Sequence, residues 1–268
     1  DMLLIAMTLV SAPLYVLFGA LSDRIGRKPV MLGGMLLALA LYFPGSHLIA
    51  SSVNPALVEA QRNNPVVVVT NPASCSAQFD PTGTRRFDSA CDIAKSLLVA
   101  RGISYRETAS PDGNTSVRIG RTALAVGGGE ALDTAALKAF KTATGDRLKA
   151  QLLAAGYPAS ADPGRIAYVP LLAILFLFVV AATALYGPQA AALVEMFPTR
   201  IRYTAMSLPY HVGTGWVGGF LPVTSFAIVA LTGDIYAGLW YSVGFTALSA
   251  LVTILFLKET RGRPLDGI

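Results

Sequence analysis

The sequence predicts an all-α polytopic membrane helix bundle of five spans, into which a small extracytoplasmic α/β domain is inserted. Five long stretches contain no Asp, Glu, Lys or Arg, and each has about the 20 apolar residues that a helix needs to cross a bilayer. They are too long and too numerous to be a cleaved signal peptide. Between the second and the third stretch lies a segment of ordinary soluble composition. The five stretches are residues 2–21, 30–50, 166–194, 206–231 and 235–257.

These boundaries predict three parts. Residues 1–50 hold spans one and two, residues 51–165 form the insertion, and residues 166–268 hold spans three to five and a cytoplasmic C-terminus. An odd number of spans is unusual for a complete transporter, and the chain begins at Asp1 directly against an apolar run. We therefore interpret it as the C-terminal part of a longer protein.

The basic residues outside the insertion predict the topology. Of 21 Lys and Arg, 13 lie in residues 51–165 and the other 8 fall at residues 24–28, 200–202 and 258–263. These are alternate ends of the five spans, and the positive-inside rule places them in the cytoplasm. The insertion is then periplasmic or extracellular, since long loops translocate largely regardless of charge. We expect a multi-pass protein of a bacterial inner membrane, with the lipid bilayer and no nucleic acid as a partner.

The first two spans are joined by a short basic hinge, residues 19–28. Pro13 in the first span is tolerated inside membranes. Ser22 or Asp23 can cap the helix that follows, and Pro29 suits its first turn. Residues 23–28 have two interpretations, a charged turn that sets topology and a conformational latch.

The insertion predicts the order strand, helix, strand, strand, helix, from its β-branched runs, helical spacing and turn residues. The elements are expected at residues 66–69, 89–101, 103–107, 117–126 and 135–155. Cys75 and Cys91 are the only cysteines, and on an oxidising side of the membrane they favour a disulfide. Two buried thiols are the alternative. The insertion contains no His, which argues against a zinc site and against an external enzyme.

The third span runs through Tyr186, Gly187, Pro188 and Gln189. We expect the Gly-Pro pair to bend or break the helix, and broken helices are where transporters build sites. Tyr186 and Gln189 are therefore candidates for a substrate or proton path. Glu195 lies at the cytoplasmic end, where a carboxylate is costly without a cationic partner.

The fourth span is the least regular, because it holds prolines and four glycines between residues 209 and 222. His211 is the only ionisable residue well within a span, and its pKa range suits proton coupling. A neutral histidine that is hydrogen-bonded to a neighbouring helix is the alternative. Regular helical spacing places His211 and Thr214 on one stripe. Further candidates for the substrate or proton path in this span are Tyr210 and Trp216.

Three motifs, all outside the insertion, resemble the major facilitator superfamily. Gly-Ala-Leu-Ser-Asp-Arg-Ile-Gly-Arg-Lys-Pro at 19–29 is similar to its signature loop. Glu-Met-Phe-Pro-Thr-Arg-Ile-Arg at 195–202 and Glu-Thr-Arg-Gly at 259–262 are similar to cytoplasmic motifs of sugar-porter-type members. Residues 203–216 are most similar to the metabolite:proton symporters. The insertion matches nothing in the family pattern.

The resemblance implies that the five spans are helices eight to twelve of a twelve-helix carrier, whose first half and most of whose seventh helix are absent here. It also implies a cytoplasmic gate, in which Glu195 pairs with Arg27 or Arg24. Asp23 caps a helix terminus or pairs with Arg200 or Arg202. The expected gate residues are Asp23, Arg24, Gly26, Arg27, Lys28, Glu195, Arg200 and Arg202.

The predicted function is therefore the C-terminal part of a secondary active transporter that works by alternating access. We expect a proton-coupled symporter of a small polar or anionic metabolite, such as an organic acid or a betaine- or proline-like solute. The proton is the coupling ion, and no cofactor, metal or catalytic residue is expected. The missing N-terminal half of the carrier is an expected partner. The alternative is a membrane-anchored extracytoplasmic binding or sensing protein that uses residues 51–165.

Overall fold

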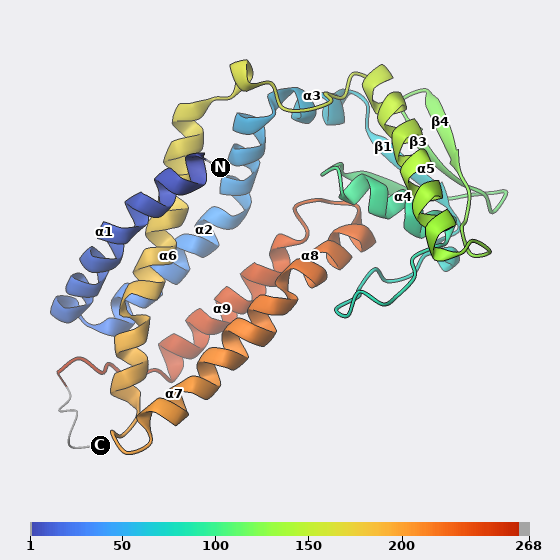
Figure 1. The fold of residues 1–268 in the computed structure, drawn as a ribbon. Coiled ribbons are helices and arrows are strands. Elements are labelled where there is room, and N and C mark those ends of the chain that lie inside the picture. Colours follow the sequence, from blue (N-terminus) through green and yellow to red (C-terminus); the bar gives the residue numbers. More distant parts are fainter. Residues whose placement is uncertain (1, 263–268) are drawn as a thin grey trace. The chain divides into compact units, whose positions relative to one another are not determined.

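The computed structural model describes residues 2–262, and most of them are helical (Figure 1). The chain forms two compact units. One holds the residues up to Ile49, Tyr168–Leu221 and the residues from Tyr241 on. The other holds Ala50–Ala167 together with Pro222–Trp240. The second unit therefore includes the C-terminal part of the predicted fourth span in addition to the insertion.

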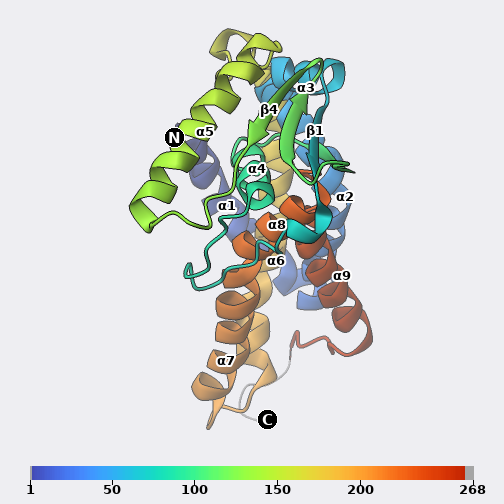
Figure 2. The same cartoon turned by 90° about the vertical axis from the view of Figure 1, so that its right-hand side faces the viewer.

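Helices follow the apolar stretches of the sequence. α1 is Met2–Ile25, α2 is Arg27–Val53, α6 is Tyr168–Met196 and α9 is Leu239–Leu255. The predicted fourth span is built from α7 (Arg202–His211), a π-helical segment (Val212–Gly218) and α8 (Gly219–Thr232). These three segments follow one another along the chain without a gap (Figures 1 and 2). Four of the described helices are long and apolar enough to cross a membrane, and α9 is a shorter apolar helix.

Small residues bring α6 close to its neighbours. A side chain at Gly34 of α2 would meet the backbone of α6 at Ala181 O. A side chain at Gly187 of α6 would lie 3.3 Å from Tyr15 O of α1. Glycines at such crossings let membrane helices pack backbone to backbone. Of the bend or break expected in the third span, the structure shows no break: α6 continues through Gly187 and the buried Pro188.

The α/β part of the second unit is built on a four-stranded sheet of order β2-β1-β3-β4. β1 (Val66–Thr70) pairs in parallel with β2 (Tyr105–Ala109), and α4 (Ala90–Val99) forms the crossover between them. β3 (Thr115–Ile119) runs antiparallel to β1 and to β4 (Thr122–Val126). α3 (Pro55–Asn63) precedes the sheet and α5 (Thr134–Ala154) follows it.

The strand expected at residues 117–126 is in fact a hairpin. Ile119 pairs with Thr122, so only Gly120 and Arg121 connect β3 to β4. Gly120 has φ +57, a conformation that glycine adopts without a Cβ penalty and that tight hairpin turns require. The expected single strand is therefore two strands because Gly120 allows the chain to reverse its direction inside an apolar run.

The core of the α/β part lies between the sheet and its helices. Val66 and Val68 of β1, Ile93 and Leu98 of α4 and Leu148 of α5 are almost fully buried. Two 3₁₀ turns, Pro72–Ser74 and Pro163–Arg165, complete the described elements.

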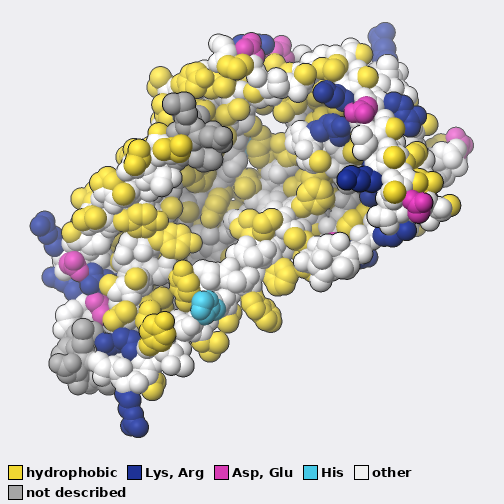
Figure 3. All heavy atoms as spheres, in the orientation of Figure 1, with side chains coloured by type: hydrophobic (Ala, Val, Ile, Leu, Met, Phe, Trp, Pro, Cys, Tyr) yellow, Lys and Arg dark blue, Asp and Glu magenta, His cyan; other side chains and the backbone are white. Residues whose placement is uncertain are grey.

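Figure 3 shows hydrophobic side chains over the long helices and charged ones gathered at the end that carries the α1–α2 connection.

Candidate functional site

Arg27, the first residue of α2, is the centre of a charge network. Its Nη2 lies 3.0 Å from Glu195 Oε1 at the end of α6, and its Nε donates to the same carboxylate at 3.3 Å. Its Nη1 donates to Ser22 Oγ at 2.7 Å and also to Asp23. The Arg27 and Glu195 side chains expose only 13% and 15% of their surface. The pair is therefore largely shielded from water. The attraction between two charges is stronger in such a place than in bulk water.

The other expected gate residues lie at the edge of this centre. Asp23 pairs with Arg27 one helical turn away, with 64% of its side chain exposed, and such exposed pairs contribute little. Arg24 and Arg200 are exposed. Arg202 Nε donates to Phe197 O at 3.0 Å, and Lys28 Nζ donates to Ile254 O at 2.9 Å. The structure thus pairs Asp23 with Arg27.

The carboxylate at the start of α2 is Glu259, which the sequence analysis gave no role. Its Oε1 accepts the backbone N–H of Arg27 at 2.9 Å, and its Oε2 that of Lys28 at 3.1 Å. The first N–H groups of a helix have no partner within it and attract negative charge. Gly26 leaves space for this carboxylate, because a Cβ there would overlap it, and has φ +110.

Burial raises the pKa of Glu259, but backbone donors outweigh this effect. The N–H groups of Arg261, Arg27, Lys28 and Thr260 together hold the pKa of Glu259 below its ordinary value. The carboxylate is therefore held in its charged form at neutral pH.

Thr260 closes the network. Its hydroxyl donates to Glu195 Oε2 at 2.5 Å, and the residue is 3% exposed. We call Ser22, Asp23, Arg27, Glu195, Glu259 and Thr260 the Arg27 network. It joins three separate segments: the hinge after α1, the end of α6 and the residues after α9. The Glu-Thr-Arg-Gly motif at 259–262 was the one sequence signal that could have located its last part.

A cavity of about 650 Å³ lies in the same compact unit. Two hydrogen bonds join its walls: the hydroxyls of Tyr42 and Thr246 are 3.2 Å apart, and Tyr241 OH donates to the backbone carbonyl of Val217 at 2.9 Å. The walls are aromatic, hydroxyl-bearing and uncharged among the described residues. They are Met31, Met35 and Tyr42 of α2; Leu185, Tyr186 and Gln189 of α6; Pro209, Tyr210, Gly213, Thr214, Val217, Gly218 and Leu221; and Tyr241, Ser242, Phe245, Thr246 and Ser249 of α9.

Four of the six residues expected on a substrate or proton path line this cavity, namely Tyr186, Gln189, Tyr210 and Thr214. His211 is exposed and Trp216 is 71% exposed, and neither is among the described lining residues. The π-helical segment explains the difference, because its turn holds more residues than the α-helical turn on which the expected stripe was drawn. The lining positions there recur at every fourth residue.

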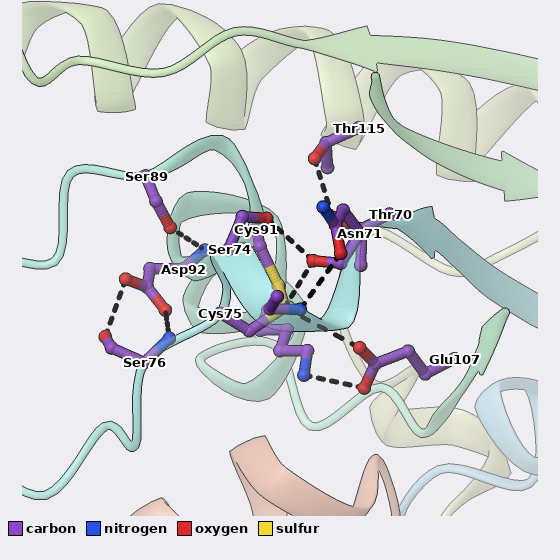
Figure 4. Close-up of a disulfide and its surroundings, with 12 residues drawn as sticks. Thr70, Asn71, Ser74, Cys75, Ser76, Ser89, Cys91, Asp92, Glu107 and Thr115 are labelled. Atoms are coloured by element: carbon purple, nitrogen blue, oxygen red, sulfur yellow. Dashed lines mark hydrogen bonds and ion pairs between the residues drawn. A yellow bond between two sulfur atoms is a disulfide. The ribbon is translucent and has the colours of Figure 1, made fainter. Parts of the chain in front are cut away.

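Cys75 and Cys91 are joined by a disulfide, with their Cα atoms 5.2 Å apart (Figure 4). It ties the turn after β1 to the first residues of α4. Beside it, Asp92 accepts from Ser76 N at 2.9 Å and from Ser76 Oγ at 2.7 Å. Both sulfurs lie near the Glu107 carboxylate, but sulfurs in a disulfide offer no thiolate to a metal. The disulfide therefore has a structural role: it holds the turn after β1 against the start of α4.

Comparison with known proteins finds similarity to a transporter family over part of the chain. Residues 150–268 match the model of the sugar (and other) transporter family. The resemblance to the metabolite:proton symporters of the major facilitator superfamily is confirmed by the relatives that the chain matches. The matched residues include α6 to α9, and with them Glu195, Glu259 and Thr260.

The relatives that this chain matches are named as bacterial transporters. It is 31% identical over 93 residues to the glycine betaine/proline/ectoine/pipecolic acid transporter OusA of Dickeya dadantii, covering 35% of this chain and 18% of the relative. It is 37% identical over 71 residues to a citrate-proton symporter of Klebsiella pneumoniae, covering 26% and 16%. A proline/betaine transporter of Salmonella typhimurium is 30% identical over 97 residues, covering 36% and 19%. The matches thus span less than a fifth of each relative. No solved structure matches the chain.

Proposed function

We propose that this chain supplies helices of a proton-coupled symporter that works by alternating access in a bacterial inner membrane. The observation that carries the proposal is the ion pair between Arg27 and Glu195, which ties the start of α2 to the end of α6. A cavity with polar and aromatic walls lies between helices of the same unit. A solute path and a bond that opens and closes one of its ends are the two parts that alternating access requires.

In this proposal the Arg27 network is a cytoplasmic latch. The basic residues at 24–28, 200–202 and 258–263 put this end of the helices in the cytoplasm by the positive-inside rule. Loss of one partner from a shielded ion pair costs about 3–5 kcal/mol where burial is complete. The two states of a carrier differ by only a few kcal/mol. A partly buried latch therefore biases the cycle without stopping it.

The cavity favours a zwitterionic, onium-bearing solute over an organic acid. Its described lining residues carry no charge but include Tyr42, Tyr186, Tyr210, Tyr241 and Phe245. Aromatic faces attract quaternary ammonium groups, whereas a multiply charged anion needs cationic partners once it leaves water. Relatives named for proline and betaine fit this chemistry better than those named for citrate.

The same topology makes the α/β part extracytoplasmic. Both ends of the insertion join helices whose opposite ends carry the basic clusters. The disulfide between Cys75 and Cys91 supports this side, because disulfides persist in oxidising compartments such as the periplasm. The proposed function requires a proton gradient, with the proton as the coupling ion, and it requires no cofactor.

Uptake into proteoliposomes tests the function. The full-length protein should take up labelled proline or glycine betaine faster when the lumen is alkaline relative to the outside than when no gradient is present. Collapse of the gradient with a protonophore is the control. Equal uptake with and without the gradient would remove the symport claim. Uptake of citrate in preference to both zwitterions would overturn the proposed substrate class.

A further inference from the structure

The edge of strand β2 is bonded to the connection between α8 and α9. Tyr105 N donates to Gly233 O at 2.7 Å, and Tyr105 OH donates to Ala230 O at 2.5 Å. Ile235 N donates to Ser104 Oγ at 3.3 Å. All five residues belong to one compact unit. The α/β part is therefore fastened to the end of α8 and the residues after it by three hydrogen bonds. In two of them the α/β part donates, and in the third it accepts.

The two sides of this contact fit closely. Tyr105 is 5% exposed and is part of the hydrophobic core of the α/β part. Gly233 has φ +74, and a Cβ there would overlap the carbonyl oxygen of Tyr105. Burial, and then the nearby charge of Glu107, raise the pKa of Tyr105, so its hydroxyl keeps the proton that it donates. The contact thus depends on a tyrosine at one position and a glycine at the other.

The fastened segment is itself cross-linked. Ser225 Oγ of α8 donates to Gly238 O at 3.0 Å, just before α9 begins. A Cβ at Gly238 would lie 3.0 Å from Ser225 O. The residues from Pro222 to Trp240 therefore form a closed hairpin that can move as a single piece.

The fourth span is divided where this piece begins. Its inner residues, up to Leu221, belong to the other compact unit, and its outer residues begin at Pro222. The π-helical segment Val212–Gly218 comes immediately before this boundary. Proline removes a helix hydrogen bond, and prolines and π-bulges are the usual sites of helix kinks. The division therefore coincides with the part of the span that bends most easily.

We propose that Tyr105 is a positioning residue that fastens the outer half of the fourth span to the α/β part. The insertion and Pro222–Trp240 then move as one body, and the span bends between Val212 and Pro222 when the carrier changes state. This role rests on the proposed transport function. The attachment of the α/β part to Pro222–Trp240, in contrast, does not depend on whether the protein transports a solute.

Hydrogen exchange in the intact protein tests the fastening. Gly233→Ala should separate Tyr105 from the connection, because alanine fits neither the φ nor the space. The amides of Tyr105 and Ile235 should then exchange about 2- to 10-fold faster, as expected for the loss of single hydrogen bonds. Gly113→Ala is the matched control, since Gly113 has φ +71 but open space around it. Equal exchange at Tyr105 and Ile235 in Gly233→Ala and wild type would overturn the proposal.

Uptake tests the positioning role. Tyr105→Phe keeps the core but loses the bond to Ala230, so the maximal rate should fall about 2- to 10-fold with an unchanged KM. Tyr157→Phe is the control, because Tyr157 is equally buried and donates within the α/β part, to Asn64 O at 2.7 Å. Tyr157→Phe should keep the wild-type rate.

The outcomes separate the two proposals. Wild-type rates in Gly233→Ala, despite faster exchange, would overturn the positioning role and leave transport standing. An equal fall in rate in Tyr105→Phe and Tyr157→Phe would mean that Tyr105 contributes only to the general stability of the α/β part. That result would also overturn the positioning role. If the wild-type protein moves no solute, the transport proposal fails, and exchange at Tyr105 still decides the fastening.

Discussion

Arg27 and Glu195 form an ion pair that joins residues 168 positions apart, with Nη2 3.0 Å from Oε1. Glu195 has a second donor in Thr260, whose hydroxyl lies 2.5 Å from Oε2. The carboxylate therefore neutralises the guanidinium at the start of α2 and also anchors the segment after α9. Removal of its charge should loosen both connections at once.

Glu195→Gln should slow proton-driven uptake and leave membrane insertion intact. Hydrogen bonds to charged groups contribute about 1.5–3 kcal/mol, so the equilibrium between the two states should shift by roughly that amount. Initial uptake rates in proteoliposomes, at equal protein content, measure the effect. Asp23→Asn is the matched control: its exposed pair is worth about 0.2–1 kcal/mol. A Glu195→Gln variant with the wild-type rate would remove the latch.

Glu259→Gln should lower thermal stability at neutral pH, because the N-terminus of α2 loses its negative partner. Such a contact is worth about 0.3–2 kcal/mol. The folded pKa of Glu259 lies below the ordinary value of 4.5. Its contribution is therefore complete above pH 4.5 and is lost as the pH falls through the lower, folded pKa. Melting curves of wild type and variant should converge in that acidic range. A difference that is constant with pH would contradict the assignment.

The sequence was sufficient for the parts of this molecule that depend on composition and local pattern. Stretches without charge predicted where α1, α2 and α6 lie, and the resemblance to the major facilitator superfamily implied Arg27 or Arg24 as the partner of Glu195. Glu259 was not assigned, because it caps a helix that begins 232 residues earlier. No local pattern reports so distant a contact.

Other differences have local causes. One glycine with positive φ, Gly120, divided an expected strand into a hairpin. The π-helical segment Val212–Gly218 changed which side chains of the fourth span face the cavity. Neither the two-residue period of a strand nor the 3.6-residue period of an α-helix anticipates these changes, because at both places the backbone departs from regular geometry. The bond from Tyr105 to Gly233 joins an inserted part to a span, and again no sequence pattern indicates it.

Cys75→Ser with Cys91→Ser should destabilise the α/β part by about 3 kcal/mol, the value expected for a loop of this length. The separation of the two cysteines is 16 residues. Denaturant-dependent hydrogen exchange of the amides in α4, in the intact protein, measures the loss. Reduction of the wild-type protein should reproduce the effect and should leave the double variant unchanged. A stability equal to that of the oxidised wild type would mean that packing alone holds the turn after β1.

Gln189→Ala should raise the KM for uptake, because Gln189 contributes the one side-chain amide among the described residues of the cavity. Loss of one hydrogen bond to a solute costs about 0.5–1.5 kcal/mol, a factor of about 2 to 10 in KM. Trp216→Ala provides the comparison: Trp216 was a candidate for the substrate or proton path, whereas the structure exposes 71% of it and it is not among the described lining residues. We expect an unchanged KM there. If Trp216→Ala raised the KM and Gln189→Ala did not, the solute would bind on the other face of the fourth span, and the cavity would not be its site.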